Sequence, residues 1–217
     1  MSGQGSDKAK AASAASERGS ELRELPAEHA LLGLLSLAGG TAHGYDLARQ
    51  FRRDQPLGEV IRLEPAMLYK HLKKLARLGW LTMTTEDQAP RPPRQVCHLT
   101  SSGEAELRRW LAEPVARTRE IRLEFLVKLY FAMHIAPELA LHLAGEQQAV
   151  MRQLASSLAE QRASLQVPPD AAPGDDLFFQ DLVLDLRLRQ THAAAEWLEQ
   201  TVTALRSRQG AGSSVAT

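Results

Sequence analysis

The sequence lacks several features that particular classes of protein require. It contains one cysteine in 217 residues, so no disulfide can form within the chain, and this usage fits a reducing compartment. No apolar run approaches the roughly 20 residues of a membrane span. The N-terminal residues also lack the apolar region of a signal peptide. We therefore expect a cytoplasmic protein with no membrane partner.

Catalytic signatures are missing as well. The sequence has no nucleophile elbow, phosphate-binding loop or dinucleotide glycine pattern. Its seven histidines are scattered, and none belongs to an H-E-x-x-H arrangement. Cys97 and His98 are neighbours on an expected strand, so their side chains should point to opposite faces and not share a metal. We expect neither an enzyme nor a bound metal or cofactor.

The charge of the chain is balanced overall but concentrated locally. The whole sequence has 26 basic and 26 acidic residues, whereas the segment from Arg62 to His98 has seven Lys or Arg against three Asp or Glu, a balance of +4. Local field matters more than net charge for phosphate binding. A neutral total argues against strong non-specific binding, so affinity for an anionic partner should depend on docking two domains at once and should fall steeply with salt.

The basic segment contains a predicted helix from Glu64 to Leu78. Pro65 suits the first helical position, where its missing N–H costs nothing. One stripe of the helix is apolar and consists of Leu68, Leu72 and Leu75. The other stripe consists of Ala66, Lys70, Lys73 and Arg77, with Lys74 beside it. A DNA recognition helix has this pattern, as does an ordinary amphipathic surface helix, and the flanking sequence favours the first.

Two helices are predicted before this one. An apolar helix that includes Leu31, Leu34, Leu35 and Ala38 ends at the pair Gly39-Gly40. A second, short helix follows from about His43 to Arg53, with Leu47, Ala48 and Phe51 on its inner face.

A hairpin is predicted after the basic helix, beyond Gly79. Leu81 and Met83 alternate with threonines, which indicates a strand. Residues 86–93 contain three prolines and are predicted as a loop, since proline removes ladder donors. The segment from Arg94 to Leu99 then returns as a second strand. Three helices followed by such a hairpin is the order of a winged helix-turn-helix domain.

These segments resemble the PadR family of bacterial transcriptional regulators over roughly residues 28–113. The resemblance is carried by residues 32–35 (LGLL), 43–47 (HGYDL), 65–72 (PAMLYKHL), Leu75 with 79–81 (GWL), 93–94 (PR) and 99–103 (LTSSG). The wing differs: the family commonly has Gly-Arg-Pro-Arg-Lys-Tyr-Tyr, where this chain has RPPRQVC over residues 91–97. The resemblance implies a winged-helix DNA-binding domain, a helical C-terminal dimerisation region and repression relieved by a signal.

The rest of the chain is predicted to be helical. An S-x-x-E capping box at Ser101–Glu104 opens a helix that ends at Pro114. Long apolar stripes follow over residues 121–135, 137–166 and 175–205, and a pair of such helices from each of two chains would form a symmetric dimer. A monomeric helical domain is the alternative. The predicted organisation is a disordered tail (1–24), a winged helix-turn-helix DNA-binding domain (25–113), a helical dimerisation domain (114–208) and a second disordered tail (209–217).

The predicted DNA contacts belong to the basic helix, the helix before it and the wing. On the basic helix they are Ala66, Met67, Tyr69, Lys70, Lys73, Lys74 and Arg77. Tyr69 has the alternative of bracing the domain internally, and Met67 of packing. His43 and Tyr45 begin the preceding helix, where His43 serves as a donor to the DNA backbone, caps the helix or simply packs. Arg91 and Arg94 lie in the wing, where Arg94 enters the minor groove or remains a surface arginine.

Two further features bear on regulation. Phe178, Phe179 and Trp197 lie on the last helix and form either part of its packed stripe or an apolar slot for a small-molecule effector at the dimer seam. Cys97 is either a packed residue or a thiol or metal sensor. The sequence as a whole predicts a mainly α, homodimeric regulator, a repressor that recognises a pseudo-palindromic operator. The rival interpretation is an adaptor whose winged-helix head contacts protein.

Overall fold

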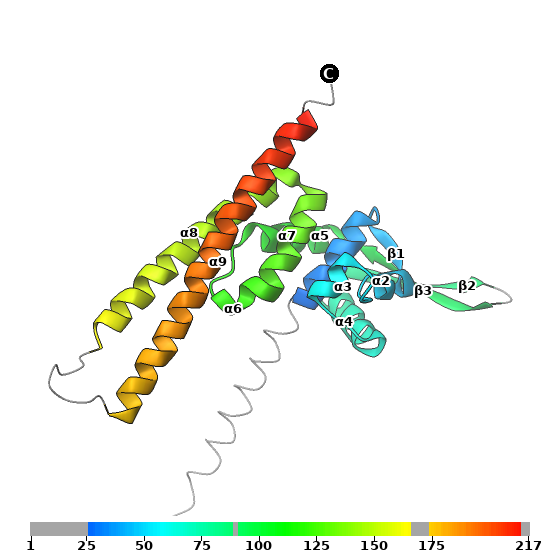
Figure 1. The fold of residues 1–217 in the computed structure, drawn as a ribbon. Coiled ribbons are helices and arrows are strands. Elements are labelled where there is room, and N and C mark those ends of the chain that lie inside the picture. The colour runs from blue at the N-terminus through cyan, green and yellow to red at the C-terminus, as the bar shows by residue number, and fades with distance from the viewer. Residues whose placement is uncertain (1–25, 89–90, 166–173, 214–217) are drawn as a thin grey trace, which may run out of the picture. The chain divides into compact units, whose positions relative to one another are not determined.

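The fold is described from a computed structural model, which covers residues 26–88, 91–165 and 174–213; the side chains of 87, 88, 91–93, 175, 176 and 210–213 are not included. The chain divides into two compact units, Met1–Trp110 and Leu111–Thr217 (Figure 1). Each unit is considered by itself. The predicted tail over residues 1–24 lies outside the described residues.

The first unit is a small sheet with helices packed against it. A helix over residues 26–37 comes first. It is followed by β1 (Thr41–His43), α2 (Gly44–Arg49), α3 (Pro56–Val60), α4 (Pro65–Arg77), β2 (Leu81–Gln88), β3 (Arg91–Leu99) and α5 (Ser101–Ala112). The sheet is antiparallel with the order β1-β3-β2. This is a winged helix-turn-helix arrangement, with β2 and β3 forming the wing.

The helix ends in this unit follow local sequence signals. The helix over residues 26–37 stops where Gly39 and Gly40 adopt φ of +71° and +88°, a region that favours glycine. Pro65 occupies the first turn of α4, and Gly79 (φ +74°) follows its end. The leucine stripe of α4 is fully buried, which confirms the predicted inner face.

Several predicted boundaries in this unit were wrong. α2 ends at Arg49 rather than near Arg53, and neither β1 nor α3 was predicted. The wing strands extend to Gln88 and Arg91, which pair with each other, so most of the proline-rich segment is strand and not loop. Prolines are tolerated there because β3 has only β2 as a neighbour near the tip and the ladder is irregular between Glu86 and Gln88.

The N-cap of α5 also differs from the prediction. The backbone N–H of Gly103 donates to the Thr100 hydroxyl at 3.1 Å, so the cap is Thr100 and not Ser101. Glu104 does not complete a capping box but accepts a hydrogen bond from Arg108 at 2.7 Å. Helix α5 therefore begins one residue earlier than the S-x-x-E pattern indicated.

The second unit is entirely helical in the residues described. It consists of α6 (Thr118–Glu120), the π-helical turn η1 (Ile121–Phe125), α7 (Leu126–Ile135), α8 (Pro137–Ala163) and α9 (Asp175–Ser213). α9 returns alongside α8, and the two form a long hairpin (Figure 1). The core of this unit includes Phe125 of η1, Leu129 of α7, and Leu143, Met151, Leu198 and Val202 of α8 and α9.

α9 continues past residue 208, where the sequence predicted a disordered tail. The amide of Gln209 donates to the carbonyl oxygen of Pro137 at 2.8 Å and so ties the end of α9 to the start of α8. At the other end of the hairpin, Arg162 of α8 bonds to Asp181 and Asp185 of α9. Within the described ranges, no helix has the length and apolar character needed to cross a membrane.

Candidate nucleic-acid interface

The outer face of α4 carries the exposed basic residues. Lys70, Lys73 and Arg77 are exposed, and Ala66 is exposed one turn before Lys70. Met67 is 39% exposed at the start of the helix. Residues spaced by three and four positions share one helix face. The structure therefore presents a small entry residue followed by three cations along one side of α4, with the leucines on the other.

Tyr69 fixes the position of α4 against α2. A Cβ atom on Gly44 would lie 3.0 Å from the Cε1 atom and 3.0 Å from the hydroxyl oxygen of Tyr69. The tyrosine side chain thus lies directly on the backbone at the start of α2, and glycine permits this approach. Of the two predicted roles of Tyr69, the structure supports the internal brace.

Lys74 is engaged inside the unit. Its ammonium group lies 2.7 Å from the Glu28 carboxylate, which also accepts a hydrogen bond from Nδ1 of His71 at 3.2 Å. Glu28 and His71 are both buried. Burial alone would raise the pKa of Glu28, but the bonds from His71 and Lys74 and the charge of Lys74 hold it below its ordinary value. Lys74 therefore joins α4 to the helix over residues 26–37 and does not belong to the exposed basic row of Lys70, Lys73 and Arg77.

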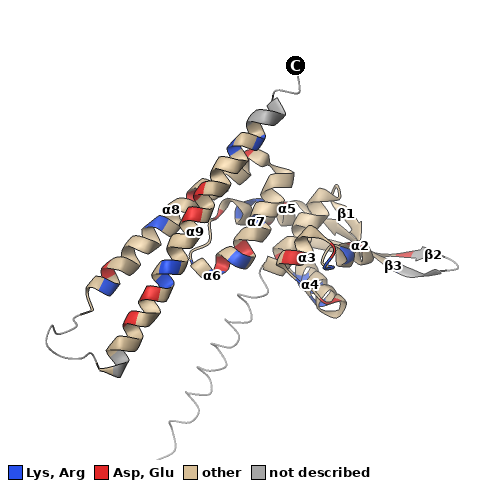
Figure 2. Cartoon of the chain, viewed as in Figure 1, with Lys and Arg blue, Asp and Glu red and all other residues tan. Residues whose placement is uncertain are grey.

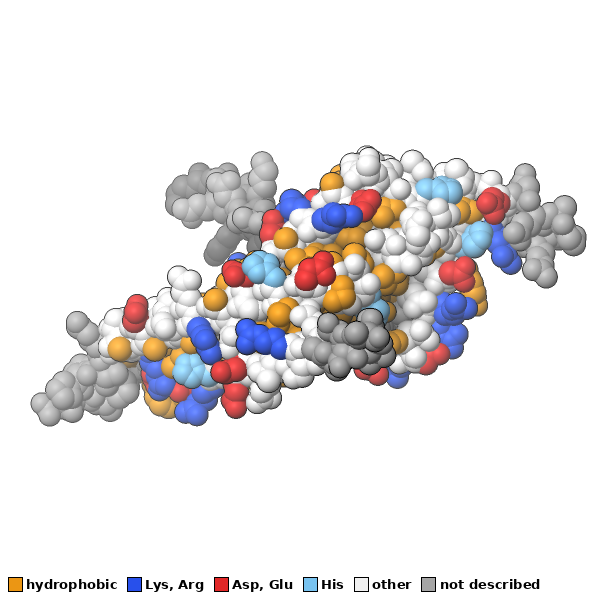
Figure 3. Space-filling model, turned by 90° about the horizontal axis from the view of Figure 1, so that it is seen from above, with side chains coloured by type: hydrophobic (Ala, Val, Ile, Leu, Met, Phe, Trp, Pro, Cys, Tyr) orange, Lys and Arg blue, Asp and Glu red, His pale blue; other side chains and the backbone are white. Residues whose placement is uncertain are grey.

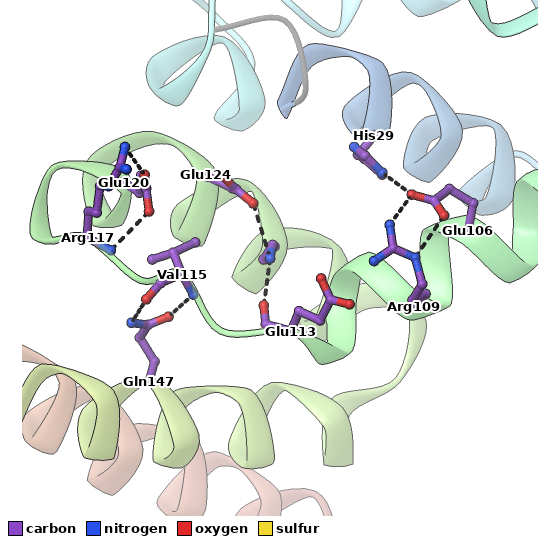
Figure 4. Close-up of polar contacts among 10 residues, drawn as sticks. His29, Glu106, Arg109, Glu113, Val115, Arg117, Glu120, Glu124 and Gln147 are labelled. Atoms are coloured by element: carbon purple, nitrogen blue, oxygen red, sulfur yellow. Dashed lines mark hydrogen bonds and ion pairs between the residues drawn. The ribbon is translucent and has the colours of Figure 1, made fainter. Parts of the chain in front are cut away.

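A second buried histidine lies next to Glu28 in the sequence. Nε2 of His29 is 2.9 Å from the Glu106 carboxylate, which is also bonded by the guanidinium of Arg109 (Figure 4). Arg109 and His29 together outweigh burial and lower the pKa of Glu106. The His29 ring stacks on Trp110, with ring centroids 4.5 Å apart. These contacts hold α5 to the helix over residues 26–37.

The sequence-based prediction missed both buried clusters. Glu28 and His29 lie on a helix chosen for its leucines, and their partners are 43 and 77 positions away. The one local signal was a polar pair, Glu28-His29, at the start of an otherwise apolar helix.

The two candidate DNA-contact residues at the start of α2, His43 and Tyr45, differ in their exposure. Tyr45 is 72% exposed. His43 is the N-cap of α2 and makes no side-chain capping bond there, and its buried Nδ1 has no hydrogen-bond partner among the described residues. The capping role suggested for His43 is therefore not the one observed.

In the wing, Arg94 is exposed on β3 opposite Glu86 of β2. Arg91 pairs with Gln88 through the backbone, and its side chain lies outside the described residues. Nearer the body of the unit, the His98 ring bridges two hydroxyls, Thr41 at 3.2 Å and Thr84 at 3.0 Å. This bridge links all three strands at the base of the wing.

Cys97 is completely buried on the central strand. Burial raises the pKa of its thiol to about 11, which keeps it protonated. Because the thiolate is the reactive form, this environment argues against a thiol sensor. Among the residues described, no three His, Cys, Asp or Glu side chains gather as a metal site would require.

Two family models match the chain, one over each unit. Residues 31–109 match the transcriptional regulator PadR-like family, and residues 121–206 match the C-terminal model described as virulence activator alpha. The Mycobacterium tuberculosis protein named Probable transcriptional regulator Rv1176c is 31% identical over 83% of this chain and 98% of its own length. The chain belongs to the PadR-like family of transcriptional regulators.

A second relative of this PadR-like chain is the Negative transcriptional regulator PadR of Bacillus subtilis, 30% identical over 79% of the chain and 93% of that protein. A crystal structure of Bacillus subtilis PadR in complex with operator DNA is 28% identical, covers 82% of this chain and 98% of that one, and has a TM-score of 0.39. Family membership rests on the sequence matches.

The candidate effector residues of the PadR-like chain do not meet within one molecule. Phe178 and Phe179 are exposed near the start of α9, whereas Trp197 lies 18 residues beyond Phe179, about 27 Å along the helix axis. Trp197 instead contacts Phe125 edge-on, with ring centroids 6.1 Å apart. A slot formed by all three aromatics is therefore not present in a single chain.

Charge elsewhere on this PadR-like molecule is mixed. Acidic and basic residues are interspersed along α8 and α9 (Figure 2). On the face seen in Figure 3, side chains of both signs alternate with hydrophobic ones and form no broad field of one sign. Positive and negative charges are thus balanced along these helices as they are over the whole chain. The exposed α4 row differs because its charged residues are all positive.

Proposed function

We propose that this PadR-like protein is a sequence-specific DNA-binding repressor that acts as a homodimer. The observation that carries the proposal is the exposed row Ala66, Lys70, Lys73 and Arg77 on α4, backed by a fully buried leucine stripe. The name of the Bacillus subtilis relative, a negative transcriptional regulator, supports repression rather than activation. We propose no enzymatic activity. Because the proposed target is chromosomal DNA, we place the protein in the cytoplasm.

The row on α4 suits the major groove. Ala66 and Met67 at the helix entry allow close approach to base edges and apolar contact with a thymine methyl. Lys70, Lys73 and Arg77 follow along the same face and suit phosphates or base acceptors. Tyr45 and Arg94 are exposed at α2 and on the wing, where they would add contacts to the DNA backbone.

Dimerisation would supply a second winged-helix domain. An apolar stripe on α9, made of Phe178, Phe179, Leu182, Val183 and Leu186, is exposed in the single chain. An exposed apolar stripe on a long helix is stabilised when a partner buries it, and a second copy of the chain provides an equivalent stripe. Two α4 helices about 34 Å apart would then read a pseudo-palindromic operator.

The test is a charge reversal on α4. The double variant Lys70→Glu, Lys73→Glu should weaken binding to the promoter DNA of the protein's own gene at least about 100-fold in gel shifts, because each reversal replaces a phosphate attraction by repulsion. In the wild type, log Kd should rise steeply with log salt. In the variant that slope should fall by roughly two.

The matched control is Arg122→Glu, Arg206→Glu. Both arginines are exposed in the second unit, so this variant has the same net charge. It should bind the promoter fragment like the wild type. Unchanged gel shifts for the Lys70, Lys73 variant would exclude α4 as the reading element and favour the adaptor function.

A further inference from the structure

A helical course continues beyond the end of α2 at Arg49. The backbone N–H groups of Gln50, Phe51 and Arg52 each donate to the carbonyl oxygen three residues earlier, at 3.2, 3.3 and 3.2 Å. Bonds of this spacing belong to a 3₁₀ turn, which commonly extends an α-helix. Leu47 and Phe51 are buried on one side of the element. The opposite side is therefore open to a partner.

The open side of this element is basic. Arg49, Arg52 and Arg53 are all exposed on it, four, seven and eight positions after the exposed Tyr45. Side chains three or four positions apart share a helix face. One aromatic residue and three guanidinium groups thus form a second exposed row, which we call the α2 row.

The α2 row has little counter-charge of its own. Nε of Arg52 lies 3.3 Å from the Asp54 carboxylate, but both side chains are more than 60% exposed. An exposed ion pair of this kind contributes little free energy, so an incoming anion can replace it. Within the described ranges, no carboxylate forms an ion pair with Arg49 or Arg53.

Helix α3 holds the backbone of the α2 row in place. A Cβ atom on Gly58 would lie 1.8 Å from the carbonyl oxygen of Arg52 and 3.0 Å from the carbonyl carbon of Phe51. Only glycine permits so close an approach of α3 to this turn. Because the backbone of the row is fixed before any partner binds, less conformational freedom is lost on binding.

The α2 row begins beside the basic row of α4. The Tyr69 ring lies directly on the backbone of Gly44, next to Tyr45, and Lys70 follows Tyr69 on α4. The two exposed basic rows therefore belong to neighbouring helices of one unit. Such an arrangement suits a polyanion that extends past α4, as the backbone of a DNA duplex does when the first helix of a helix-turn-helix crosses it.

We propose that Arg49, Arg52 and Arg53 bind phosphate groups of the DNA strand beside the groove that α4 enters. The planar guanidinium group matches phosphate oxygens and can bind them in pairs. Phosphate contacts position a protein on DNA but carry no sequence information directly. The α2 row thus supplies affinity and orientation, whereas α4 reads the bases. This site rests on the proposed function and adds a phosphate clamp to it.

Gel shifts of the full chain test the clamp on two DNA fragments of equal length, the promoter fragment and an unrelated one, over a range of salt. The variant Arg49→Gln, Arg53→Gln should bind both fragments at least about tenfold more weakly, because the lost contacts do not depend on sequence. The dependence of log Kd on log salt should become shallower by roughly two for each protomer that contacts DNA. The ratio of promoter to unrelated affinity should stay constant.

The matched control is Arg122→Gln, Arg206→Gln, which removes the same charge from exposed positions in the second unit and should bind both fragments like the wild type. A gain of affinity provides a test that misfolding cannot imitate. Asp54→Asn releases Arg52 from its ion pair and should tighten binding to both fragments severalfold. Glu160→Gln removes the same negative charge from an exposed position on α8 and should leave binding unchanged.

The clamp is overturned if the Arg49, Arg53 variant keeps the affinity and salt dependence of the wild type, or if Asp54→Asn binds no tighter than Glu160→Gln. A fall in the ratio of promoter to unrelated affinity would show that the α2 row reads bases and would overturn its assignment to phosphates. A wild type that binds neither fragment overturns the proposed function and the clamp together, whereas a wild type that binds DNA no better than the variant overturns the clamp alone.

Discussion

At the scale of single residues, Glu28 ties the first described helix to α4. It is 1% exposed and accepts bonds from His71 and Lys74. Glu28→Gln should lower the free energy of unfolding by about 3 kcal/mol at pH 7, since removal of one partner leaves buried groups uncompensated. Urea denaturation measures the change. Glu104, whose side chain is 47% exposed and pairs with Arg108, provides a control, and Glu104→Gln should cost less than about 0.5 kcal/mol.

The same substitution should alter how stability depends on pH. The pKa of Glu28 is lowered in the folded state, so its contribution is present above the ordinary value of 4.5 and is lost as pH falls through the folded-state value. The difference in unfolding free energy between wild type and Glu28→Gln should therefore shrink below pH 4.5. A constant difference from pH 7 to pH 3 would show that the charge of Glu28 contributes nothing.

Cys97 should be inert in the native protein. Its thiol is completely buried, and the raised pKa of about 11 leaves very little thiolate near neutral pH. Iodoacetamide should label Cys97 in urea but hardly at all in the folded chain, as followed by mass spectrometry. Promoter binding should respond to oxidant equally in the wild type and in Cys97→Ala. A response that this variant abolishes would make Cys97 a sensor after all.

At the scale of secondary-structure elements, sequence patterns correctly located the helices whose ends depend on local signals. Pro65, the leucine periodicity and Gly79 placed α4 within one residue at each end. β1 was missed because a three-residue strand exists only through its pairing with β3. The wing strands were predicted too short because proline is a poor guide where a strand has a single neighbour.

The candidate DNA-binding residues also divide into those that local sequence predicts and those whose role depends on distant partners. The exposed face of α4 follows from spacing along one helix, and the structure presents Lys70, Lys73 and Arg77 there. The role of Lys74 depends on Glu28, 46 positions earlier in the chain, which no local pattern reveals.

The connection between α5 and α6 depends on one side chain of α8. Gln147 is fully buried and satisfies both backbone groups of Val115. Gln147→Ala should destabilise the protein by about 2–4 kcal/mol, since it leaves a buried N–H and a buried carbonyl without partners. Urea denaturation measures this. The partly exposed neighbour Gln148 is the control, and a cost for Gln148→Ala equal to that for Gln147→Ala would contradict the role of the Gln147–Val115 hydrogen bonds.

At the scale of the whole molecule, the proposed dimer makes the function of the α4 row depend on the α9 stripe. A single neutral chain with one short basic row gains little affinity from phosphate contacts, whereas two rows held at a fixed spacing gain it together. Leu182 and Leu186 are 49% and 56% exposed on α9, so glutamates there are accommodated in the monomer but are costly in an apolar dimer seam.

The variant Leu182→Glu, Leu186→Glu should therefore sediment as a folded monomer with an unchanged circular dichroism spectrum. Its affinity for the promoter should fall by at least about 100-fold, because the second head no longer docks at a fixed distance. Gln200→Glu, Thr203→Glu adds the same charge at exposed positions further along α9 and should remain a dimer that binds DNA. If the leucine variant stays dimeric, α9 contributes its apolar stripe to something other than self-association. If it is monomeric yet keeps full affinity, one head suffices and the operator need not be palindromic.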